Sequence, residues 1–103
     1  MKPAVAVARL SALAQESRLA VFRLLVQRGP EGLPAGEIAA RLKVPQATMS
    51  FHLKELSRAG LLRSRQQGRF IYYAPDFKAM QGLVGYLTEN CCAESACAPG
   101  VCS

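Results

Sequence analysis

A three-residue break between two amphipathic segments constrains the fold of this chain more than any other feature. Residues 43–45, which end in Pro45, separate a short segment over 35–42 from a longer one over 46–59. Apolar residues recur in both segments every three or four positions, as on one side of a helix. Two helices joined by so tight a turn predict a helix-turn-helix unit. The predicted inward residues are Ile38, Leu42, Met49, Leu53 and Leu56.

Two further helices are predicted before this unit. The first covers residues 4–14. The second covers residues 16–28 and is apolar on nearly all sides, which is typical of a buried central helix. Gly29, Pro30 and Gly32 then break the chain. The residues expected to face the core are Val7, Leu10, Leu13, Leu19, Phe22, Leu25 and Val26.

A hairpin and a last helix are predicted after the unit. Residues 61–65 and 69–74 have strand character, and Gly68 between them tolerates the positive φ of a tight turn. Asp76 is a suitable N-cap for a helix that reaches about Asn90. The expected fold class is therefore mainly α with a small two-stranded wing, in the order α-α-α-α-β-β-α.

The positive charge of the chain is concentrated in one segment. The 103 residues carry a formal net charge of +6. Residues 41–78 contain eight basic and two acidic side chains, so this segment alone accounts for the whole excess. Such clustering favours a polyanionic partner such as nucleic acid, although a solvated basic face is the simpler alternative.

The outward face of the helix over 46–59 suits the major groove of DNA, which admits one helix. Gln46, Thr48 and Ser50 lie in its first turns, where we expect contacts to base edges. Phe51 fits a thymine methyl or a sugar, or alternatively packs against a neighbouring loop. Phosphate contacts are predicted for Lys54, Arg58, Arg63, Arg65 and Arg69.

His52, the single histidine of the chain, belongs to the same helix. No cysteine or second histidine is close to it in sequence, as a metal site would need. We therefore predict that His52 lies on the helix surface, near the DNA or hydrogen-bonded at the helix edge, and count it among the DNA-binding residues.

All four cysteines lie at the end of the chain, as the adjacent pair Cys91 and Cys92, then Cys97 and Cys102. Thiolates are soft ligands, and trivalent arsenic takes three sulfurs in a pyramid. Adjacent cysteines supply two of these sulfurs with little strain. We predict an As(III) or Sb(III) site formed by Cys91, Cys92 and Cys97, with Cys102 as the alternative third ligand. A zinc site with four thiolates is less consistent, because Cys-x-x-Cys pairs are missing.

The chain resembles the ArsR/SmtB family of metal-responsive repressors through its residues 44–56, 59–62 and 68–73. The resemblance covers about residues 8–90. It implies a homodimeric winged helix-turn-helix repressor whose first and last helices form the dimer interface. It also implies that binding of an inducer lowers the affinity for operator DNA. On this resemblance, the interface residues are Leu10, Leu13, Phe77, Met80, Val84 and Leu87.

Two metal sites of that family are absent from this sequence. The family places cysteines on the helix before the recognition helix, where this chain has Pro34 and Gly36. Some relatives build a zinc site on the last helix from histidine and carboxylates, but residues 76–90 contain no histidine. Some arsenite-responsive members carry a vicinal cysteine pair and a later cysteine at the end of the last helix. The terminal cysteines therefore remain the predicted site.

The sequence thus predicts an arsenite- or antimonite-responsive repressor and not an enzyme. Residues 1–90 are expected to bind an inverted-repeat operator in double-stranded DNA as a homodimer, and residues 91–103 to form a cysteine-rich inducer-binding tail. A repressor switched by thiol oxidation, or one that responds to Cd, Pb or Zn, is the alternative. No apolar run approaches the ~20 residues of a membrane span, and no secretion signal is apparent. We expect a cytoplasmic protein that uses no organic cofactor.

Overall fold

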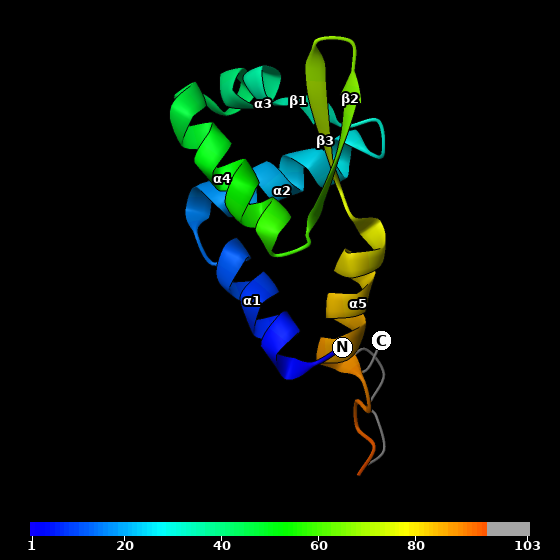
Figure 1. The fold of residues 1–103 in the computed structure, drawn as a ribbon. Helices are drawn as coiled ribbons and strands as arrows, with labels where there is room; N and C mark the ends of the chain where they lie inside the picture. Colours follow the sequence, from blue (N-terminus) through cyan, green and yellow to red (C-terminus); the bar gives the residue numbers. More distant parts are fainter. Residues whose placement is uncertain (95–103) are drawn as a thin grey trace.

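A computed structural model describes residues 1–94 of the chain (Figure 1). It confirms the predicted winged helix-turn-helix fold, with five helices and a three-stranded antiparallel sheet in the described part. No helix among these residues is long and apolar enough to cross a membrane. The elements are α1 (Pro3–Leu13), α2 (Glu16–Arg28), β1 (Leu33–Pro34), α3 (Ala35–Leu42), α4 (Gln46–Arg58), β2 (Leu62–Gln67), β3 (Phe70–Pro75) and α5 (Phe77–Thr88).

The core lies where α2, α3 and α4 meet the base of the sheet. Ile38 of α3 and the predicted stripe Met49, Leu53 and Leu56 of α4 are fully buried. Val21, Phe22 and Leu25 of α2 pack in the same cluster, which confirms α2 as the central helix. Burial of each such side chain contributes about 1.5–3 kcal/mol, so this cluster fixes how α4 is presented to the outside.

The turn between α3 and α4 is closed by backbone bonds. The N–H of Val44 donates to the Ala39 carbonyl at 3.0 Å, and Lys43 adopts a left-handed φ of 55°. Gly60 follows the C-cap of α4 and has a φ of 81°. This left-handed conformation confirms the prediction that Gly60 ends the helix. Asp76 caps α5, since its carboxylate accepts from the Ala79 N–H at 3.0 Å. The last helix ends at Thr88 rather than at Asn90.

The sheet has one strand that the sequence did not predict. β1 is two residues long and pairs Leu33 with Tyr73 of β3, so the strand order is β1-β3-β2. Gly32 precedes it with a φ of 73°, and a Cβ there would lie 2.3 Å from the carbonyl oxygen of Tyr73. A side chain cannot occupy that space, so Gly32 permits the close approach of β1 to β3.

Three apolar residues expected in the core are exposed instead. Val7 and Leu10 of α1 point outward, because Ala6 and Ala12 form the buried side of that helix. Leu19 of α2 is also exposed, whereas Val21, Phe22 and Leu25 of the same helix are buried. The apolar spacing located the helices correctly but assigned the wrong side to these residues.

A long-range hydrogen bond joins α1 to the end of α4. The Arg9 Nε donates to the carbonyl oxygen of Ala59 at 3.2 Å, across fifty positions of sequence. Ala59 is the C-cap of α4, so its carbonyl has no partner within the helix. Arg9 satisfies that carbonyl and fixes the distance between the two helices at this point.

Candidate nucleic-acid interface and cysteine pair

The outward face of α4 carries the side chains predicted to read DNA. Gln46, Thr48, Ser50 and Lys54 are exposed, as expected, and lie on or near the first two turns of the helix. Phe51 is 55% exposed, so no neighbouring loop covers its side chain. A helix that presents small polar groups around one exposed aromatic ring is shaped for a groove with hydrogen-bonding edges and methyl groups.

The predicted phosphate-binding arginines fall into different settings. Arg58 lies 3.6 Å from Glu55 on the same helix, an exposed pair that contributes little to stability. Arg65 is already engaged: it donates to the Glu31 carbonyl at 2.7 Å, and its guanidinium lies 4.9 Å from the Tyr72 ring centroid. Arg63 and Arg69 are exposed. The DNA-binding role of all these residues stays a prediction.

His52 is buried, and the prediction of a surface position for it was wrong. Only 6% of the residue is exposed, because it shares the inner side of α4 with Met49 and Leu56, three positions before it and four after it. Within residues 1–94 its Nδ1 has no hydrogen-bond partner. Burial lowers the pKa of His52 below its ordinary 6.5, and the charge of Arg18 lowers it further.

The lowered pKa predicts that acidification destabilises the fold. Between the folded-state pKa of His52 and 6.5, the unfolded chain binds more protons at this site than the folded chain does. The free energy of unfolding therefore falls as the pH drops through this window and is constant above it. Urea unfolding at a series of pH values measures the effect, and His52→Leu should remove this part of the pH dependence. An unchanged slope in His52→Leu would assign it to other groups.

Helices α1 and α5 lie side by side at the end of the molecule away from the wing tip (Figure 1), and several of their apolar side chains are exposed. Val84 and Leu87 of α5 are 57% and 58% exposed, and Val7 of α1 is 60% exposed. Leu10 is exposed too, while Leu13, Phe77 and Met80 are half-buried. Exposed apolar side chains gathered on neighbouring helices are typical of a contact surface.

The two described cysteines lie just beyond α5. The Cys91 N–H donates to the Thr88 carbonyl at 3.1 Å, which ties the pair to the last turn of the helix. Asn90 and Cys92 have left-handed φ values of 59° and 57°, and both belong to the turn that follows the helix. The Sγ atoms of Cys91 and Cys92 are 3.7 Å apart. Cys92 also takes part in a disulfide bond.

The other predicted ligands, Cys97 and Cys102, lie outside the described residues. Within residues 1–94 no group of three histidine, cysteine, aspartate or glutamate side chains is placed to hold a metal ion. Pro34 and Gly36, which stand at the family's helix site, belong to β1 and to the first turn of α3. The described residues therefore include two of the four predicted thiol ligands, Cys91 and Cys92.

Comparison with known proteins identifies the fold's family. A helix-turn-helix domain model matches residues 13–65. The transcriptional activator HlyU of Vibrio cholerae is 30% identical over 86% of this chain and 80% of its own length. The arsenical resistance operon repressor of Bacillus subtilis is 31% identical over 82% of this chain and 76% of its own. The chain belongs to the ArsR/SmtB family of winged helix-turn-helix transcriptional regulators.

A solved structure agrees with this assignment. The homodimeric winged helix-turn-helix domain of Mb0332 from Mycobacterium bovis, a possible ArsR-family regulator, superposes with a TM-score of 0.66. It is 25% identical and covers 91% of this chain and 87% of its own. The prediction that this ArsR/SmtB protein is a DNA-binding regulator and not an enzyme is confirmed.

Proposed function

We propose that this ArsR/SmtB regulator is an arsenite- or antimonite-responsive repressor that binds its operator as a homodimer. One observation supports the proposal above all others. The vicinal pair Cys91 and Cys92 begins three residues after the end of α5, and α5 carries the exposed apolar face. A thiol site at that position adjoins the surface on which a second subunit would pack.

A second copy of the chain is the proposed occupant of the α1–α5 face. Mb0332, of the same fold, is a homodimer. A twofold axis along this face would present two α4 helices on one side of the dimer. Recognition helices of such dimers enter successive major grooves about 34 Å apart, which suits an inverted-repeat operator.

The proposed inducer chemistry needs reduced thiols. Arsenous acid, As(OH)₃, exchanges each hydroxyl for a thiolate and releases water, so a three-sulfur site uses one thiol per hydroxyl. The separation of 3.7 Å between the Cys91 and Cys92 sulfurs is close to van der Waals contact, which one arsenic atom can bridge without moving the backbone far. Cys97 is the proposed third ligand and Cys102 its alternative. The disulfide of Cys92 must be reduced before the metalloid binds.

Binding would act on the operator through α5. The Cys91 N–H is bonded to the last turn of that helix, so closing a metalloid ring on the pair changes the helix end beside the partner subunit. A coupling of only about 1–3 kcal/mol between the two sites weakens operator binding about 5–150-fold.

Operator binding with and without arsenite, in the presence of a non-thiol reductant, tests the proposal. We expect the wild-type protein to lose affinity about 5–150-fold, and Cys91→Ser and Cys92→Ser to bind DNA normally but to ignore arsenite. Cys102→Ser is the matched control, because it removes a thiol that the favoured ligand set does not use. Undiminished binding of the wild type under saturating arsenite would refute the proposal.

A repressor switched by thiol oxidation is the second candidate, and the disulfide of Cys92 favours it. Peroxide in place of arsenite would then release the operator, and Cys102→Ser or Cys97→Ser would lose that response if either supplies the partner thiol. Titration with Cd, Pb and Zn in the same assay separates a thiolate site of broader metal preference from one selective for As(III).

A further inference from the structure

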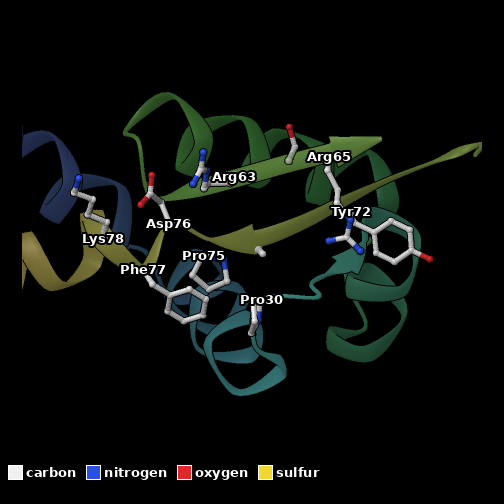
Figure 2. Close-up of a pocket in the computed structure, with 10 residues that line it drawn as sticks. Pro30, Arg63, Arg65, Tyr72, Pro75, Asp76, Phe77 and Lys78 are labelled. Atoms are coloured by element: carbon white, nitrogen blue, oxygen red, sulfur yellow. The ribbon is translucent and has the colours of Figure 1, made fainter. Parts of the chain in front are cut away.

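A pocket on the wing lies apart from both the recognition helix and the cysteine pair. It has a volume of about 450 Å³ and is formed by β2, β3, the loop after α2 and the first residues of α5 (Figure 2). This volume is within the range of small-molecule sites, about 300–1,000 Å³. The proposed response to arsenite makes no use of it.

The pocket carries more positive than negative charge. Arg63, Arg65 and Lys78 line it, together with the single carboxylate of Asp76. That carboxylate is committed to the helix cap, where it accepts from the Ala79 N–H. Within residues 1–94 neither Arg63 nor Lys78 forms an ion pair. Two cations are therefore available to an anionic group that enters here.

The walls between these charges are flat and apolar. Phe77 and Pro75 lie below Arg63 in Figure 2, and Tyr72 lies beside Arg65 at the other end. Arg65 is held in place by the Glu31 carbonyl at 2.7 Å and by the Tyr72 ring at 4.9 Å. A guanidinium fixed in this way keeps its remaining N–H groups oriented, which reduces the entropy lost when a ligand binds.

The pocket does not face the side on which α4 packs. Arg63 and Arg65 are paired with Ala74 and Tyr72 across the hairpin, whereas Leu62, which points to the opposite side of β2, is buried in the core beneath it. Figure 1 places α4 and the loop that follows α2 on opposite sides of the hairpin. A small ligand is thus favoured over the DNA backbone as the occupant.

We infer that this pocket binds a small aromatic carboxylate. Paired N–H groups of arginine match the two oxygens of a carboxylate, and the rings of Tyr72 and Phe77 suit a flat apolar body. The loop between β3 and α5 forms part of the wall, so such a ligand would contact both the wing and the helix of the proposed dimer interface.

Titration of the full-length protein with benzoate, followed by amide NMR shifts, tests this inference. We expect saturable shifts at Tyr72 and Phe77. Binding should be about tenfold weaker for benzyl alcohol, which lacks the carboxylate, and for inorganic phosphate, which lacks the aromatic ring. Arg63→Gln, whose side chain makes no hydrogen bond in the described part, should weaken benzoate about tenfold, as should Lys78→Gln. Lys54→Gln on α4 is the matched control and should bind benzoate normally.

Absence of saturable benzoate shifts in the folded wild type would overturn the inference. Phosphate that binds as tightly as benzoate would also overturn it. A third contrary outcome is that benzoate does not bind and Arg63→Gln loses as much operator affinity as Lys54→Gln, which would assign the pocket to the DNA backbone. None of these outcomes depends on the cysteines, so the test is independent of the arsenite response.

Discussion

Replacing both Val84 and Leu87 by glutamate is expected to convert the protein to a monomer and to weaken operator binding about 10²–10⁴-fold. Both side chains are more than half exposed in the single chain and lie on one side of α5. If a second copy covers them, each glutamate places an uncompensated charge in an apolar interface. The monomer then binds one half-site only and loses the gain from two linked contacts.

Sedimentation of the double variant and a gel shift with the full operator measure these two effects. Gln27→Glu on α2 is the control, because it introduces a glutamate at an exposed position outside the apolar face. The wild-type oligomer and affinity should persist in Gln27→Glu. A double variant that remains dimeric would place the interface elsewhere on the molecule.

Gly32→Ala is expected to destabilise the fold by about 2–5 kcal/mol. The added Cβ would meet the carbonyl oxygen of Tyr73 at 2.3 Å, and the left-handed φ of 73° adds its own strain. Since the neighbour is backbone rather than a flexible side chain, relief requires β1 to separate from β3. Urea unfolding of the variant and the wild type gives the difference in the free energy of unfolding.

Gly68→Ala separates the two causes. Gly68 has a similar φ of 62°, but nothing lies within 4 Å of a Cβ placed there. Its substitution should cost only the conformational strain, about 1–2 kcal/mol. Equal losses in the two variants would show that the contact with Tyr73 contributes nothing.

The elements with a strong local signal were predictable from the sequence. The bounds of α2 and α3 and the Asp76 cap follow from apolar spacing and from polar caps, which act within a few residues. β1 has no such signal, because two residues ending in a proline resemble a loop. Its pairing with β3 depends on Gly32 and on a partner forty residues away.

The sides of the helices were less predictable than their positions. Val7 and Leu10 have the spacing of core residues, and a single sequence cannot tell a core from a contact between subunits. His52 was assigned to the surface because no further metal ligand is close to it in sequence, although its spacing from Met49 and Leu56 indicated the inner side. The engagement of Arg65 with Glu31 also depends on a tertiary contact that spacing does not encode. In the candidate thiol site, only the Cys91–Cys92 geometry is described.

The hydrogen bond from Arg9 to the Ala59 carbonyl links α1 to the C-terminal end of α4. If the proposed dimer forms, a rotation of one subunit against the other must move α4 together with α1 or break this hydrogen bond. In such a dimer, a change at the α1–α5 face would reach α4 through α1.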